Sequence, residues 1–157
     1  MAAPKVHPLN TDEEVVWRAL THLLVVLRRS LGDDLERLAG IGGTDYVVLM
    51  SLSEAPRRQL RMSDLARRCD LSASRITRLV DALSQQGLVV KERAIGDARS
   101  NLATLTDAGY RRLRETYPVH LANVRHRVFD HLSAEEVALL GPILERITSG
   151  LEPKGEA

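Results

Sequence analysis

Residues 63–105, SDLARRCDLSASRITRLVDALSQQGLVVKERAIGDARSNLATL, decide the fold. They predict a short helix, a tight turn at Asp70 and Leu71, a second helix over 73–86, and a β-hairpin after Gly87. The second helix has apolar residues at helical spacing on one face, namely Ile76, Leu79, Val80 and Leu83. Polar residues occupy the opposite face near its N-terminus, namely Ser74, Arg75, Thr77 and Arg78. This pattern indicates a helix that packs on one side and presents small and basic groups on the other.

The hairpin is expected to pair strands over 88–93 and 102–105 through a loop over 95–100. Such a loop is longer than a simple strand reversal needs, and it carries Arg99, with Arg93 at its edge. The preceding QLRM segment, residues 59–62, is expected to be extended and to pair with the hairpin. The loop therefore indicates a functional projection.

Capping patterns predict where the helices begin. Thr11, Ser63 and Ser72 each precede a helical run, and Thr44 with Asp45 is expected to cap a helix that ends near Glu54. Ser133 to Glu136 reads as a capping box. Glycines at 40, 42 and 43 are expected to end the first helix, while Gly32, Pro118 and Pro142 are expected to kink or bend their helices.

Apolar stripes mark both ends of the chain. The residues over 11–38 and over 106–151 repeat leucine, valine and isoleucine every three or four positions, which indicates helices that need a packing partner. Aromatic residues make up only 3% of the chain, so an aliphatic core built from helix-on-helix packing is expected. The predicted fold is mainly α with a small β-hairpin, in a single domain over 1–157. Residues 44–105 are expected to form a helix-turn-helix lobe with a β-hairpin, between N- and C-terminal helices over 11–38 and 106–151 whose apolar faces suit dimerisation.

Charge is distributed unevenly along the chain, although the net charge is only +1. Residues 57–99 contain 10 Lys and Arg against 5 Asp and Glu, whereas the rest of the chain contains 12 against 16. A basic segment within an otherwise acidic chain is typical of a protein that binds the phosphate backbone. A solvated, arginine-rich surface is the alternative interpretation.

A helix with a polar, basic N-terminus fits the major groove of DNA, where arginine reads guanine and serine or threonine reaches bases or phosphates. We therefore expect Ser72, Ser74, Arg75, Thr77 and Arg78 to contact DNA. Arg78 also has Asp81 one turn later, so an ion pair within the helix is the alternative for that residue.

The order of three motifs resembles the winged helix-turn-helix of the multiple-antibiotic-resistance regulator (MarR) family. These are DLARRCDLSASRITRLVDALSQQGLV, then Asp97-x-Arg99, then LATLTDAG ending at Gly109. The resemblance implies a homodimer whose terminal helices interleave, and two lobes that bind a pseudo-palindromic site in double-stranded DNA. It implies a transcriptional regulator, with repression and release by a small molecule as the expected mode.

The same resemblance implies roles in the hairpin loop. Arg99 matches an arginine that enters the minor groove, Asp97 matches the acid that holds it, and Arg93 adds a further cation. Ala98 and Ser100 depart from the commoner D-R-R-G form, so one basic residue is missing.

Family members commonly bind small, often phenolic, molecules between the dimer helices and the DNA lobes. The matching candidates here are Trp17, Arg18, His22 and Tyr46, which offer flat rings and a cation for an anionic aromatic effector. Packing in the core or in the dimer interface is the alternative role for the two aromatic residues.

Other classes of function find less support. Cys69 is the single cysteine, which excludes an internal disulfide and fits a cytoplasmic protein; an inward position favours a core role over a redox sensor. His120, His126 and His131 with Asp130 lack the spacing of a zinc site. No catalytic motif, apolar leader or membrane-spanning run is evident, so we expect no enzyme, no cofactor and no membrane partner. A winged helix that binds proteins without reading DNA remains the alternative.

Overall fold

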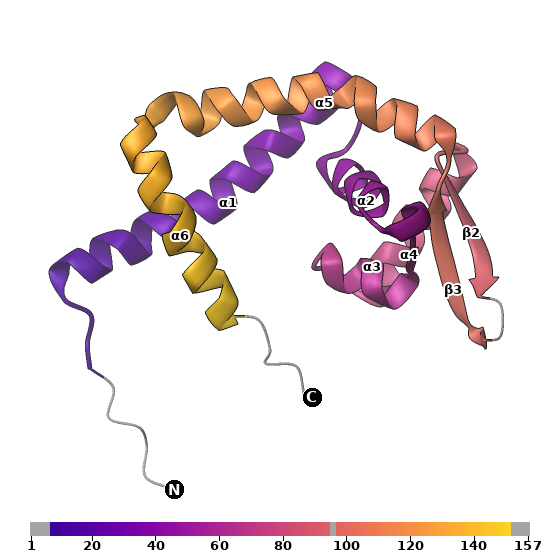
Figure 1. Ribbon diagram of the computed structural model, residues 1–157, viewed down its shortest axis with the longest axis horizontal. Coiled ribbons are helices and arrows are strands. Elements are labelled where there is room, and N and C mark those ends of the chain that lie inside the picture. Colours follow the sequence, from indigo (N-terminus) through magenta and orange to yellow (C-terminus); the bar gives the residue numbers. More distant parts are fainter. Residues whose placement is uncertain (1–6, 95–96, 152–157) are drawn as a thin grey trace, which may run out of the picture.

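The structure is a computed structural model that describes residues 7–94 and 97–151, with the side chains of 94–100 excepted. In this part of the chain six α-helices accompany one small sheet (Figure 1). Helices α1 (Thr11–Ala39) and α5 (Asp107–Arg127) lie side by side and form an elongated stem. A lobe built from α2, α3, α4 and the sheet sits at one end of this stem. The predicted mainly helical winged helix-turn-helix is confirmed.

The N-cap of helix α1 lies one residue earlier than expected. Asn10, not Thr11, is the N-cap: its Oδ1 accepts from the Glu13 N–H at 2.9 Å, and the Glu13 carboxylate accepts from the Asn10 N–H at 2.8 Å. The helix continues through Gly32, where a kink was expected, and ends at Gly40 in the left-handed conformation, with φ of 60°.

Ion pairs join α1 to α5 in the stem. The buried carboxylate of Asp34 accepts from Arg37 on its own helix at 2.9 Å and from Arg127 Nε at 2.7 Å. These hydrogen bonds, from Arg37 and then Arg127, lower the pKa of Asp34. Arg112 of α5 donates to the carbonyl groups of Ala39 and Gly40 at 2.5 and 3.0 Å, which satisfies the C-terminus of α1.

The lobe begins with α2 (Gly43–Ser53), η1 (Pro56–Arg58), β1 (Gln59–Arg61) and α3 (Met62–Arg68). Two expected caps are wrong. Helix α2 starts at Gly43, ahead of Thr44, because its N-terminus packs closely against Gly32 of α1. Helix α3 starts at Met62 directly after β1, so Ser63 lies inside its first turn.

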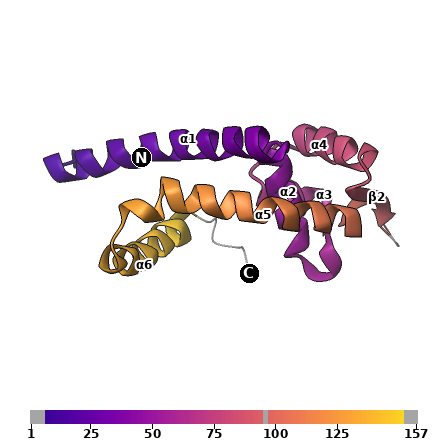
Figure 2. The same ribbon diagram turned by 90° about the horizontal axis from the view of Figure 1, so that it is seen from above.

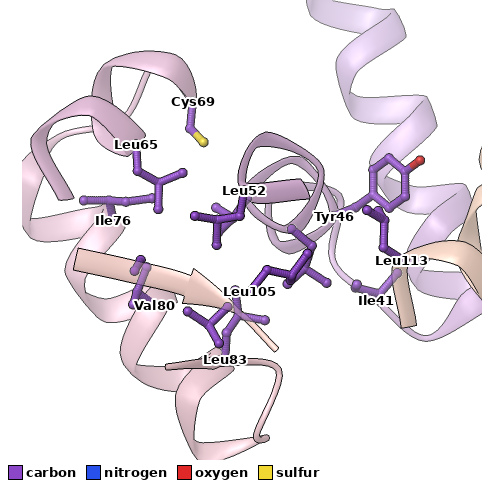
Figure 3. Close-up of a cluster of buried hydrophobic side chains, with 14 of the residues drawn as sticks. Ile41, Tyr46, Leu52, Leu65, Cys69, Ile76, Val80, Leu83, Leu105 and Leu113 are labelled. Carbon is purple, nitrogen blue, oxygen red and sulfur yellow. The ribbon is translucent and has the colours of Figure 1, made fainter. Parts of the chain in front are cut away.

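One aliphatic core holds the lobe together (Figure 3). Helix α4 (Ala73–Gln85) directs Ile76, Val80 and Leu83 inward, against Leu52 of α2 and Leu65 of α3. Each of these five side chains is almost fully inaccessible to solvent. Burial of such side chains contributes roughly 1.5–3 kcal/mol each, so the apolar face of α4 fixes which way its polar face points.

The sheet has the order β1-β3-β2, with both pairs antiparallel. Strand β1 pairs with β3, which confirms the expected extended segment before α3. Strand β2 (Val89–Ala94) lies one residue later than the predicted 88–93, whereas β3 (Asp97–Leu105) is longer than the predicted 102–105, so strand replaces most of the expected 95–100 loop. Their register shifts between Arg93, opposite Asn101, and Ala94, opposite Asp97.

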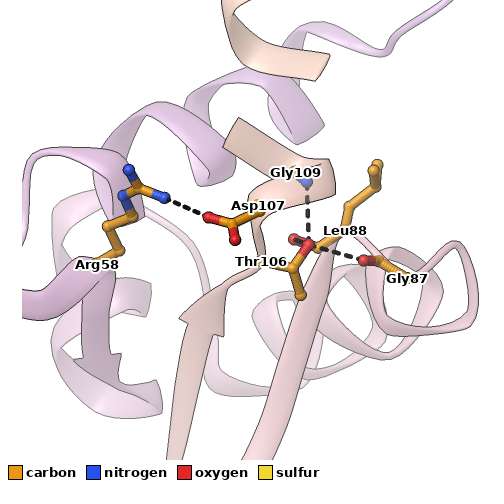
Figure 4. Close-up of polar contacts among 6 residues, drawn as sticks. All are labelled: Arg58, Gly87, Leu88, Thr106, Asp107 and Gly109. Carbon is orange, nitrogen blue, oxygen red and sulfur yellow. Dashed lines mark hydrogen bonds and ion pairs between the residues drawn. The ribbon is translucent and has the colours of Figure 1, made fainter. Parts of the chain in front are cut away.

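Helix α5 starts against the end of α4 and the first strand of the hairpin (Figure 4). Thr106 is its N-cap: the hydroxyl accepts from the Gly109 N–H at 3.0 Å and donates to the Gly87 carbonyl at 2.8 Å. Gly109 lies so close to Leu88 that a Cβ placed on it would be 2.1 Å from the Leu88 carbonyl oxygen. The helix start predicted at Thr106 is confirmed.

The C-terminal part of the chain forms two helices, and each continues through the proline at which a bend was expected. Helix α5 runs through Pro118 without interruption, ends at Arg127, and is followed by η2 (Phe129–His131) and α6 (Ala134–Leu151), which runs through Pro142. The predicted capping box is confirmed, with Ser133 and Glu136 bonded reciprocally. In Figure 2, α6 lies apart from α1. Every residue of α6 is exposed in the single protomer.

Replacement of Gly109 by alanine is expected to destabilise the protein. The added methyl group would overlap the Leu88 carbonyl oxygen, so α5 must move away from the hairpin. We expect a loss of about 2 kcal/mol or more in the free energy of unfolding, measured by urea denaturation. Gly150→Ala is the matched control, since its Cβ meets nothing within 4 Å. Equal stability of Gly109→Ala and wild type would contradict this account.

Candidate nucleic-acid interface and ligand cavity

The N-terminus of α4 is an exposed polar surface with some of its groups already engaged. Ser72 is the N-cap, and its Oγ accepts from the Arg75 N–H at 3.3 Å. Ser74 Oγ lies 3.3 Å from Ser72 Oγ, and Thr77 Oγ1 donates to the Ala73 carbonyl at 2.8 Å. Ser72 is therefore a structural cap, as predicted, and the Thr77 hydroxyl retains only its acceptor capacity.

Arg75 and Arg78 project from this surface. Both side chains are exposed, and in the described part of the chain no hydrogen bond or ion pair joins either one to another side chain. The alternative pair between Arg78 and Asp81 is not formed. Asp81 instead binds Lys91 of β2, with Nζ 2.8 Å from Oδ1. Two guanidinium groups thus remain available on the recognition face.

The hairpin provides the second part of the candidate interface. Arg93 lies in β2 and is exposed. The backbone of Asp97 and Arg99 belongs to β3, but their side chains lie outside the described residues, so their roles remain predictions. In Figure 1 the hairpin extends from the lobe beyond the helices, as a wing would.

A cavity of about 420 Å³ lies where the stem meets the lobe. It is lined by the second half of α1, the start of α2, the end of α3 and the middle of α5. Tyr46 and His120 form an aromatic wall with ring centroids 4.7 Å apart, and Arg28 and Arg29 supply positive charge at its edge. The Nδ1 atom of His120 is buried and has no hydrogen-bond partner among the described residues. The cavity thus combines flat rings, two cations, the two acidic residues Asp33 and Glu36, and an unpaired polar atom.

The four predicted effector residues do not meet in one place. Tyr46 is buried in the cavity wall, whereas Trp17 lines a separate apolar hollow near the start of α1 with Leu9 and Leu20. Arg18 is exposed and pairs with Glu14 at 3.1 Å, and His22 is exposed on the same helix. Within one protomer, only Tyr46 of the four lines the larger cavity.

Burial shifts the ionisation of the residues around this cavity. It raises the pKa of Tyr46, with smaller contributions from Tyr117 and Glu54, and it lowers the pKa of His120, so the neutral forms are favoured. Cys69 is buried and donates to Ser51 Oγ at 3.6 Å; burial raises the pKa of its thiol. A buried thiol kept protonated is a poor nucleophile, which supports a core role for Cys69.

The histidines of the C-terminal half are dispersed. His120 lines the large cavity, while His126 and His131 line a smaller hollow between α1 and the end of α5. Within residues 7–94 and 97–151, no group of three His, Cys, Asp or Glu side chains is arranged to hold a metal ion. Nor is any helix in those ranges long and apolar enough to cross a membrane.

Sequence reasoning missed Arg28, Arg29, Lys91 and the position of His120. Arg28 and Arg29 precede Gly32 by one turn, and the crossing of α1 and α2 at that glycine brings them to the cavity. Successive side chains of a strand point to opposite faces, so Lys91 points away from the face that carries the exposed Val90 and Glu92. This alternation was a signal that Lys91 faces the recognition helix.

A family profile described as the MarR family matches residues 39–100. Two curated proteins of Bacillus subtilis are each 30% identical to this chain. The HTH-type transcriptional repressor YetL aligns over 69% of the chain and 67% of its own length. The uncharacterised HTH-type transcriptional regulator YkoM aligns over 88% and 91%.

The fold also matches a crystal structure of Sco3205, a MarR family transcriptional regulator from Streptomyces coelicolor in complex with DNA. The TM-score is 0.86 at 37% identity, over 97% of this chain and 95% of that one. The family profile covers most of the lobe, and the match to the structure of Sco3205 covers both lobe and stem. The chain belongs to the MarR family of transcriptional regulators.

Proposed function

We propose that this protein is a cytoplasmic, homodimeric repressor that reads a pseudo-palindromic operator and is released by a small aromatic effector. The observation that carries the proposal is the unpaired Arg75 and Arg78 at the exposed N-terminus of α4, beside a projecting hairpin. The DNA complex of Sco3205 and the repressor YetL support DNA binding and repression as the activity. An interaction module would not need basic residues on both the helix and the hairpin.

In the proposed complex α4 enters the major groove, where Arg75 and Arg78 reach base edges and Ser74 reaches a base or phosphate. Arg93 and Arg99 follow the neighbouring backbone and minor groove, with Asp97 orienting Arg99. Two lobes bind successive grooves about 34 Å apart only when the stem of the dimer holds them at that spacing.

Substitution of these arginines should separate base reading from phosphate binding. Arg75→Ala or Arg78→Ala should reduce the free energy of binding by about 1–3 kcal/mol on the operator, and by less on operators mutated at the contacted base. Arg99→Ala should weaken binding to all sequences and reduce the salt slope by about one unit. Anisotropy titrations would use the DNA footprinted upstream of the protein's own gene.

Arg114→Ala removes an exposed cation of α5 and serves as the control for net charge. Unchanged affinity in both recognition-helix variants would refute the proposed reading surface. Uniform weakening across all operators would assign Arg75 and Arg78 to phosphates instead of bases.

The second copy is proposed to cover the apolar faces of α1 and α6. Helix α6 exposes Val137, Leu140, Ile143, Leu144 and Ile147 in the protomer. Helix α1 exposes Val16, Trp17, Leu23, Leu24 and Val25. Contiguous apolar faces of this kind mark protein interfaces, and a two-fold dimer is the commonest way to bury them.

Light scattering should therefore give a mass of about 35 kDa, twice the 17.4 kDa protomer. The double substitution Leu140→Asp/Leu144→Asp should shift the protein toward the protomer mass, because two charges would be buried in the interface. Glu145→Ala on the same helix is the control and should remain dimeric. A wild-type protein of protomer mass would exclude the proposed dimer.

The effector is proposed to occupy the cavity at the junction of stem and lobe. An aromatic ring would lie against Tyr46 and His120, and a carboxylate or phenolate would face Arg28 and Arg29. Release from DNA further requires that the effector bind more tightly to a state in which the lobes are misplaced for the operator.

Titration calorimetry with a panel of aromatic carboxylic acids should detect binding to the wild type. The double variant Arg28→Ala/Arg29→Ala should bind about tenfold or more weakly, since a charge-assisted contact is lost. Arg18→Ala, which alters the separate Trp17 region, should bind normally. The reverse pattern would place the effector beside Trp17, Arg18 and His22.

A further inference from the structure

Arg78 on the same helix and Lys91 of β2 are both candidates to pair with Asp81, and the structure pairs it with Lys91 alone among the described residues. Its Oδ1 is 2.8 Å from Lys91 Nζ, although Arg78 sits one turn earlier on the same helix, at the i, i+3 spacing that favours ion pairs. The Asp81 side chain is 50% exposed and that of Lys91 is 25% exposed. The pair therefore forms at the surface, on the helix that carries the candidate reading residues.

Strand geometry directs Lys91 toward this carboxylate. Lys91 lies opposite Ala103 in the β2–β3 register, two residues after the buried Val89, so its side chain emerges on the α4 side of the sheet. Helix α4 packs against β2 through the buried Val80 and Leu83. Because both elements are fixed by the core, Lys91 is held beside Asp81.

We propose that Lys91 is a positioning residue for DNA recognition, which engages Asp81 and so leaves Arg78 available to the DNA. The inference rests on the proposed contact between Arg78 and DNA. Without Lys91, the free carboxylate of Asp81 would attract Arg78 along the helix and draw it away from the DNA. Lys91 acts through Asp81 and Arg78 and needs no DNA contact of its own.

The effect of Lys91 on DNA binding can be measured separately from its effect on folding stability. An ion pair between partly exposed side chains contributes little to folding stability. A guanidinium drawn away from a base can cost about tenfold in affinity, which corresponds to the lower part of the range for one bidentate contact. Loss of Lys91 should therefore weaken DNA binding more clearly than it lowers the melting temperature.

The test is a mutant cycle measured by anisotropy on the footprinted operator, using the full-length protein. Lys91→Ala should bind about tenfold more weakly than wild type, whereas Asp81→Asn should bind at least as tightly. The double variant Lys91→Ala/Asp81→Asn should recover wild-type affinity. In an Arg78→Ala background, Lys91→Ala should have no further effect. Arg114→Ala again controls for the loss of one charge.

Each other result counts against the proposal. A double variant as weak as Lys91→Ala would make Lys91 a direct phosphate contact, and a weakened Asp81→Asn would make the ion pair a structural brace. If Arg78→Ala weakens binding but Lys91→Ala does not, the positioning role fails and the proposed DNA contact stands. If Arg78→Ala itself binds normally, the positioning role of Lys91 and the proposed contact of Arg78 with DNA both fail. Melting temperatures of all variants identify any that are unfolded.

Discussion

The close seating of α5 on the end of α4 and the first hairpin strand is the contact on which the lobe depends. Thr106 links the Gly87 carbonyl to the Gly109 N–H, and the missing side chain at Gly109 lets the helix lie against Leu88. Nearby, Arg58 pairs with Asp107 at 3.1 Å and covers the Tyr110 ring. The last turn of the recognition helix, the hairpin and the stem therefore meet in one rigid crossing, so a movement of α5 must carry the lobe with it.

The recognition helix was predictable because its signals are local. Ile76, Val80 and Leu83 define its inner face, Ser72 caps it, and Gly87 ends it with positive φ. The helix starts at Gly43 and Met62 were missed because neighbouring elements set them: the crossing of α1 and α2 in one case, the end of β1 in the other. The cavity was only partly predictable, since it joins four helices that are distant along the chain.

A count of the basic residues in the lobe does not locate a binding surface, because some of these residues are already paired with acids. Several of the cations that make the segment basic are engaged in ion pairs: Arg67 with Asp64 and Arg68 with Glu54 in the lobe, and Arg58 with Asp107 at the start of α5. These pairs contribute little to stability at the surface, but they reduce the local field. Arg75 and Arg78 differ in having no such partner among the described residues. The start of α4 therefore keeps two unpaired cations, and a count over the whole segment does not single it out.

Gly43 has a consequence that reaches beyond packing. A Cβ on this residue would be 2.7 Å from the Gly32 Cα, and both glycines line the cavity at the junction of stem and lobe. Any side chain at position 43 would therefore push α1 and α2 apart and fill part of the cavity in the same step. The angle of the lobe and the shape of the cavity cannot be varied independently there. In the evolution of this protein, selection on the cavity through that position would therefore also act on the placement of the lobe.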